Sequence, residues 1–219
     1  MGLSQTRRHS LFGAGHARPA DTLPVDLLDA LNADADRYRF DPGVPPGCGT
    51  AATASLHDPA PAAAARWLAA TAGRADLGGP FAPNDAGYHC TPRGSDSTAP
   101  LRTSRFYAEC VAVVVLRGHM SVSVHAERDR GLVLDGWSAG PGDVVLLRGW
   151  SPLGQADPRP YHRFAVADGR SCLTLRVGHN LVASVPPSPW LTGLTRAEIT
   201  TAGYLAARPV SPCRPAPDR

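Results

Sequence analysis

The spacing of apolar and polar residues divides the chain into a helical first part and a strand-rich second part. Three leucines recur at helical spacing behind a proline, which predicts a short amphipathic helix over residues 23–32. An alanine-rich segment predicts a second helix over 60–72. Turn residues are dense over 40–49 and 78–100, which indicates loops or very short strands. Residues 1–22 are polar and broken by glycine and proline, so we expect them to be loosely packed.

From residue 100 onward, short runs of β-branched residues replace the helical pattern. In the run over 119–125, apolar and polar positions alternate strictly, with Met120, Val122 and Val124 on one face. Runs of this kind, about 8–14 residues apart, predict an all-β sandwich or barrel. The expected strands span 106–117, 119–125, 131–136, 144–147, 162–166 and 172–177.

Composition and charge narrow the expected partners. All 22 basic residues are arginine, and they are scattered among acidic residues at a net charge of +3. Because no basic patch forms, we expect no nucleic-acid partner. No apolar run is long enough to span a membrane, and no apolar segment follows the charged start, so we expect a cytoplasmic protein without a membrane partner. The 5 cysteines are odd in number and widely spaced, which predicts free thiols.

Four segments of the second half resemble the cupin superfamily. They are Val113–Gly118, Trp137–Leu147 with its Pro-Gly-Asp turn, Pro160–Phe164 and Ser171–Arg176. The resemblance implies a mainly β protein with a cupin-like jelly-roll barrel over 100–182. Residues 1–99 would then be an N-terminal extension with short helices and loops. Residues 183–219 would be a Pro-rich C-terminal extension that packs on the barrel and ends in a disordered tail.

This chain departs from the metal-binding cupins at the first metal-binding motif. Those cupins carry a His-x-His pair and a glutamate there, and one more histidine in the second motif. In this chain Arg102, Ser104 and Arg105 stand near the positions of the His pair, and Glu109 stands near the glutamate. His162 matches the histidine of the second motif. The resemblance therefore predicts either no cofactor or a single divalent metal ion (Fe, Ni, Mn or Zn).

Should a metal be present, His162 is its first expected ligand, joined by His119, His125 or His89. His119 and His125 lie roughly 20 Å apart along one strand, so both cannot bind one ion. A solvent-facing strand is the simpler explanation of these two histidines, and one of them could join His162 only if this polar face looks into the barrel.

The candidate catalytic residues are His162, Glu109 and Tyr107. His162 and Glu109 would transfer protons, and Tyr107 would donate a hydrogen bond from its phenol. Strand alternation places Arg105, Tyr107 and Glu109 on one face, which an exposed ladder of ion pairs would also explain. Arginine suits carboxylate or phosphate recognition because its planar guanidinium forms paired hydrogen bonds. The candidate substrate-binding residues are Arg102, Arg105, Arg176 and Tyr161.

The sequence thus predicts an enzyme of specialised metabolism that acts on a small anionic metabolite in the barrel. The expected chemistry is acid–base (isomerisation, cyclisation or elimination), without a metal or with a reduced metal site. Two alternatives stay open: a non-haem, thiol-dioxygenase-like oxygenase, and a non-catalytic small-molecule-binding cupin. The expected partner is a small-molecule substrate, and a homodimer through the barrel is left open.

Overall fold

The structure is a computed structural model, and its described residues all belong to one compact unit within residues 1–181. They are residues 14–38, 50–74, 81–94, 102–103, 107–128, 132–150, 159–166 and 171–181. The predictions for the loop 40–49 and for the extension 183–219 with its tail lie outside these ranges. Within the ranges, no helix is both long enough and apolar enough to cross a membrane.

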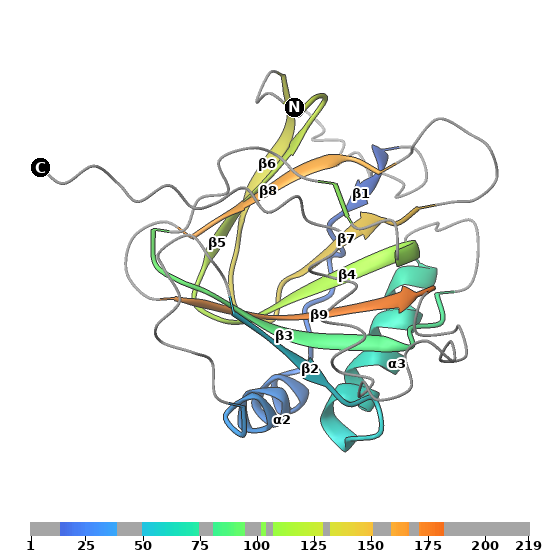
Figure 1. Ribbon diagram of the computed structural model, residues 1–219, viewed down its shortest axis with the longest axis vertical. Coiled ribbons are helices and arrows are strands. Elements are labelled where there is room, and N and C mark those ends of the chain that lie inside the picture. Colours follow the sequence, from blue (N-terminus) through green and yellow to red (C-terminus); the bar gives the residue numbers. More distant parts are fainter. Residues whose placement is uncertain are drawn as a thin grey trace, which may run out of the picture. The chain divides into compact units, whose positions relative to one another are not determined.

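In the described ranges, antiparallel strands make up two sheets, and two helices accompany them (Figure 1). The larger sheet has six strands in the order β1-β7-β4-β9-β3-β2, and the smaller has three in the order β6-β5-β8. The helices are α2 (Val25–Ala35) and α3 (Pro59–Gly73). The strands are β1 (His16–Ala17), β2 (Thr50–Ala54), β3 (Asp85–Thr91), β4 (Tyr107–Arg117), β5 (Met120–His125), β6 (Val133–Ala139), β7 (Val144–Arg148), β8 (Tyr161–Ala165) and β9 (Cys172–Asn180).

One face of the larger sheet packs against both helices (Figure 1). Leu31 of α2 and Leu68 of α3 are fully buried in one apolar cluster with Val114 of β4 and Leu175 of β9. Every second residue of a strand points to the same face, so the alternate residues of these strands point away from the helices. The helices therefore leave the other face of the sheet to the smaller sheet.

The second apolar cluster lies between the two sheets. It joins Val113 and Val145 of the larger sheet to Met120 and Val122 of the smaller one, with Phe164 packed against it. This cluster is the interior of the barrel, and side chains on the same strand faces share that interior.

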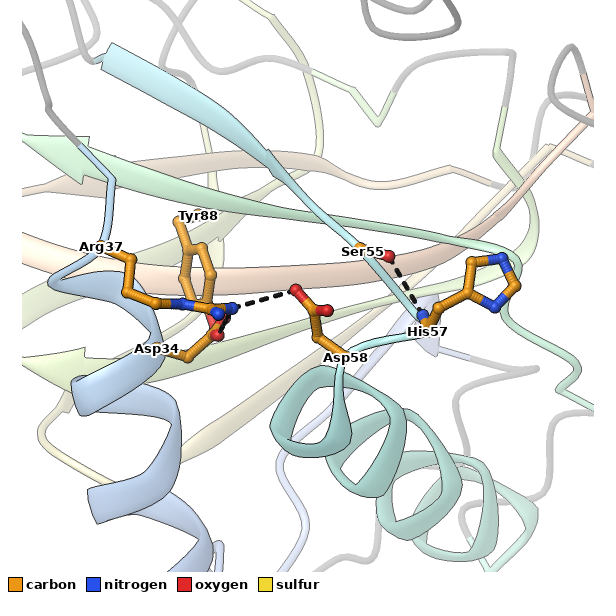
Figure 2. A network of polar contacts seen from close by, with 6 residues as sticks. All are labelled: Asp34, Arg37, Ser55, His57, Asp58 and Tyr88. Atoms are coloured by element: carbon orange, nitrogen blue, oxygen red, sulfur yellow. Dashed lines mark hydrogen bonds and ion pairs between the residues drawn. The ribbon is translucent and has the colours of Figure 1, made fainter.

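A polar network anchors the helices to the sheet (Figure 2). The buried Tyr88 of β3 donates a hydrogen bond from its hydroxyl to Oδ2 of Asp34 in α2, at 2.7 Å. Arg37, two residues after the end of α2, forms ion pairs with Asp34 and with Asp58, which directly precedes α3. The network thus connects α2, α3 and β3, and burial together with Asp34 raises the pKa of the Tyr88 hydroxyl.

The predicted helices and strands are confirmed, with shifts of a few residues at their ends. Three strands that precede residue 100 (β1, β2 and β3) belong to the same sheet as β4, β7 and β9. The loose packing expected for residues 1–22 is wrong at His16–Ala17, which pairs with β7. Strands as short as β1, or as poor in β-branched residues as β3, lack the pattern that identifies strands in a sequence.

Candidate functional site

Tyr107 lies inside the barrel, across the backbone of β9. A Cβ atom added at Gly178 would stand 2.5 Å from Cδ1 of the Tyr107 ring, so the ring occupies the space that a side chain would need. Only 8% of Tyr107 is exposed. Glycine at position 178 therefore allows the phenol ring to lie against the strand.

Asp85 receives the polar end of this ring. The Tyr107 hydroxyl donates to Oδ2 of Asp85 at 2.6 Å, and the Asn180 amide donates to the same oxygen at 3.1 Å. Asn84 holds Asn180 in turn, since its amide donates to the Asn180 carbonyl at 3.0 Å and its Oδ1 accepts the Asn180 backbone N–H at 2.6 Å. These hydrogen bonds fix the Asp85 carboxylate where β3 begins.

Arg176 of β9 stacks on the same ring. Its Cζ atom lies 4.2 Å from the centre of the Tyr107 ring. Arg176 is paired with Val113 of β4, a residue of the interior cluster, so it belongs to the inner face of the sheet. A guanidinium that stacks by its face directs its N–H groups outward in its own plane, which is the geometry that binds a carboxylate.

His162 faces the same interior from the smaller sheet. It is paired with Val124 of β5, and its ring centre lies 5.2 Å from that of Phe164. Burial and, to a smaller extent, the positive charge of Arg176 lower the pKa of His162 to about 4, although a long contact with the Pro160 carbonyl acts in the opposite direction. The imidazole is therefore neutral at pH 7 and able to accept a proton.

We call Asp85, Tyr107, His162, Arg176 and Asn180 the polar cluster. It combines a fixed carboxylate, a guanidinium and a neutral imidazole next to an otherwise apolar interior. In chemical terms, a guanidinium can bind an anionic organic group, and a neutral imidazole can accept a proton.

Three of the predicted site residues, His162, Tyr107 and Arg176, thus come together in the barrel. Arg102 and Tyr161 form a separate pair, with Cζ of Arg102 4.2 Å from the centre of the Tyr161 ring. Tyr161 precedes His162 in β8, so its side chain belongs to the opposite strand face. The predicted Arg105 lies outside the described residues.

The structure does not place Glu109 beside Tyr107 in the interior, because Glu109 is exposed whereas Tyr107 is buried. Glu109 is exposed and has a φ of 57°, in an irregularity where the pairing of β4 with β9 shifts between Ala108 and Val111. The backbone of residue 150 fixes the irregularity, because Trp150 donates its N–H to the Tyr107 carbonyl at 2.7 Å. The simple alternation assumed from the sequence fails at this β-bulge.

The histidines named as metal ligands do not gather around His162. His119 packs near Gly140 at the far end of β5, and His125 lies on the outer strand face, where its Nε2 bonds to Ser123 at 2.8 Å. His89 of β3 shares the inner face, opposite Thr174. Throughout the described ranges, no three His, Cys, Asp or Glu side chains are close enough together to hold a metal ion. The donor set present there does not fit a three-ligand metal centre.

A histidine that sequence reasoning missed also reaches the interior. His16 of β1 is 4% exposed, stacks on Trp137 of β6 at 5.8 Å between ring centres, and bonds through Nε2 to Oδ2 of Asp135 at 3.0 Å. Its Nδ1 faces the Ala14 carbonyl at 3.1 Å. Asp85 was missed too, since the sequence around it reads as a turn. In both cases only the strand pairing reveals the position.

No family model and no curated protein matches this sequence. Solved structures match at the level of fold. The epimerase SnoN from nogalamycin biosynthesis, described as a non-heme alpha-ketoglutarate-dependent enzyme, is 14% identical with a TM-score of 0.56, over 78% of this chain and 81% of SnoN.

Two further structures show the same likeness. An oxidoreductase of the 2OG-Fe(II) oxygenase family from Burkholderia pseudomallei is 14% identical with a TM-score of 0.55, over 79% of this chain and 91% of its own. HygX from Streptomyces hygroscopicus, solved with nickel, 2-oxoglutarate and hygromycin B, is 14% identical with a TM-score of 0.53, over 81% of this chain and 88% of its own. The chain therefore has the fold of these solved structures, which confirms the mainly β, jelly-roll-like fold expected from the sequence.

Proposed function

We propose that this chain is an enzyme that binds a small organic carboxylate between its two sheets and removes a proton from it. The observation that supports the proposal is that Arg176 and a neutral His162 lie on the inner faces of opposite sheets. In this proposal Arg176 holds the carboxylate, and His162 accepts the proton.

The bound anion would also activate His162. The positive charge of Arg176 is one of the two causes that lower the pKa of His162. A carboxylate on Arg176 offsets this charge and so raises the pKa of the imidazole toward its ordinary range. His162 is then a stronger base when the ligand is present than when it is absent, which couples proton transfer to correct binding.

We place the enzyme in specialised metabolism. SnoN comes from nogalamycin biosynthesis, and HygX was solved with hygromycin B. Both have the fold of this chain, although a shared fold does not determine the substrate. All basic residues of the chain are arginine, and we associate this composition with specialised metabolism.

A metal-dependent oxygenase that uses 2-oxoglutarate is the second candidate. The names of SnoN and of the Burkholderia pseudomallei oxidoreductase favour it, since they refer to alpha-ketoglutarate and 2OG-Fe(II) chemistry. Because the donor set of the described residues does not fit a three-ligand metal centre, we derive no step through a metal ion. In this candidate His162 and Arg176 would still face the ligand.

Titration calorimetry with glutarate and 2-oxoglutarate tests the proposal. We expect Arg176→Met to weaken carboxylate binding by roughly 10–100-fold, because a charged hydrogen-bonding partner is lost. Arg102→Met is the matched control, since Arg102 also stacks on a tyrosine at 4.2 Å but lies outside the polar cluster. Equal affinities for wild type and Arg176→Met, or no binding of either acid, contradict the proposal.

Metal titration separates the two candidates. Fe(II), Mn(II), Ni(II) and Zn(II) are added to the wild type and to His162→Ala, with and without 2-oxoglutarate. One equivalent of metal bound tightly by the wild type, and lost in His162→Ala, favours the oxygenase. Carboxylate binding that does not change with metal favours the acid–base enzyme.

A further inference from the structure

We propose that the ligand carries a hydrogen-bond donor, a hydroxyl or an ammonium group, near its carboxylate, and that Asp85 receives this donor. The substrate class is then a hydroxy or amino carboxylic acid. This inference rests on the proposed function, because it assumes that Arg176 binds the carboxylate.

The first observation is which oxygen of Asp85 the protein uses. Tyr107 and Asn180 both donate to Oδ2, at 2.6 and 3.1 Å. A carboxylate has about four acceptor sites on its two oxygens. The protein therefore directs Oδ2 toward its own donors, and Oδ1 is the oxygen that a ligand's donor would meet.

The second observation is that Asp85 belongs to the same interior surface as Arg176. Asp85 is paired with Gly178 of β9, and Arg176 stands two residues before Gly178 on the same strand face. Such diagonal neighbours are roughly 7–8 Å apart between their strand positions. Both side chains are partly exposed, so neither is sealed into the apolar core.

The third observation is the phenol ring between the two charges. Arg176 stacks on the face of the Tyr107 ring, and Asp85 accepts from its hydroxyl. The rigid Tyr107 side chain therefore contacts a cation at the face of its ring and an anion at its hydroxyl. A ligand complementary to this arrangement has a carboxylate for Arg176 and a donor for Asp85, because a ligand that displaces water from these groups must replace the hydrogen bonds they lose.

The arrangement also predicts what the site rejects. A 2-oxo group has only acceptors, and it would face the Asp85 carboxylate with no proton between the two oxygens. The ligand that fits best is thus a hydroxy or amino acid, and a 2-oxo acid fits less well.

Four five-carbon acids that differ only at C2 test this inference by calorimetry: glutarate, 2-oxoglutarate, 2-hydroxyglutarate and glutamate. We expect the wild type to bind at least one donor-bearing acid, 2-hydroxyglutarate or glutamate, about tenfold more tightly than glutarate and 2-oxoglutarate. In Asp85→Asn, which keeps an acceptor but loses the charge, we expect any preference for glutamate over glutarate to fall to about one. Asp21→Asn, at an exposed ion pair with Arg74, is the control and keeps the wild-type ratios.

The outcomes distinguish this inference from the proposed function. If the acids bind through Arg176 without regard to the C2 group, the inference is wrong and the proposed function stands. If none of them binds, or if Arg176→Met binds as well as the wild type, both are wrong. The comparison among ligands uses the wild type alone, so it holds even if Asp85→Asn does not fold.

Discussion

His162 shows how one residue gains chemistry from its surroundings. An imidazole ordinarily titrates near the physiological range, but burial and the charge of Arg176 lower the pKa of His162 to about 4. The folded protein thus keeps a neutral base at pH values where an exposed histidine would already be protonated. Because the pKa of His162 is lowered in the folded protein, this residue makes the free energy of unfolding depend on pH.

We expect the free energy of unfolding to fall as the pH drops from about 6.5 to about 4. In this window the unfolded chain takes up a proton on His162 that the folded protein does not bind, and below it the effect levels off. The loss is at most about 3 kcal/mol, and His162→Gln should not show it. Denaturant unfolding of both proteins between pH 7 and pH 4 measures the difference. A constant difference across that range contradicts the assignment.

Residue types alone identify three of the five residues of the polar cluster. Tyr107, His162 and Arg176 stand out because chemically versatile side chains interrupt apolar strands. Asp85 does not, because an Asn-Asp pair in a turn-rich segment looks the same whether or not its carboxylate faces a barrel. Asn180 does not either, because it follows the end of the last predicted strand at residue 177. Only the pairing of Asp85 with Gly178 places it against Tyr107.

At the scale of elements, the helices depend on polar as well as apolar contacts with the sheet. Tyr88 is fully buried, and its hydroxyl donates to Asp34, which is 8% exposed. Arg37 and Asp58 extend the network toward the solvent (Figure 2). The buried and the exposed ends of one network should therefore contribute unequally to stability.

We expect Tyr88→Phe to reduce the free energy of unfolding by about 1–3 kcal/mol, because it removes a donor from a buried carboxylate. Asp58→Asn changes only the more exposed ion pair with Arg37, and it should cost less than about 1 kcal/mol. Urea unfolding of the two variants and the wild type gives the comparison. Equal losses in the two variants would show that burial does not set the strength of this network.

The elements themselves were largely predictable, and their exceptions have physical causes. The two helices and the six strands after residue 106 follow from apolar spacing. The bulge at Glu109 does not, since it depends on the backbone hydrogen bonds between Tyr107, Glu109 and residues 149–150. A contact between distant segments of this kind leaves no periodic signal in the sequence.

At the scale of the whole described unit, β1 links the two sheets. His16 pairs with Leu147 in the larger sheet, and its ring reaches Asp135 and Trp137 in the smaller one. Both ring nitrogens face acceptors, a backbone carbonyl and a carboxylate. A two-residue strand is thereby held at both of its sides.

We expect His16→Phe to loosen β1 and leave the rest of the sheets intact. Phenylalanine keeps a ring for stacking on Trp137 but donates no hydrogen bond. The amide of Arg148, which donates to the Gly15 carbonyl at 2.8 Å, should then exchange with solvent faster than in the wild type. Amides between β4 and β9 should keep their exchange rates, and hydrogen exchange resolved by residue tests both statements. Uniformly faster exchange, or no change at Arg148, contradicts this role of His16.

The position of β9 has a consequence for synthesis of the protein. β9 is the last described strand in the chain, yet it lies between β3 and β4 in the larger sheet. While residues 172–180 are still inside the ribosome, β3 and β4 each expose an unpaired edge of backbone donors and acceptors. The sheet therefore cannot be completed strand by strand during translation. Chains that terminate before residue 172 should be targets for chaperones and proteases, because their open edges favour aggregation.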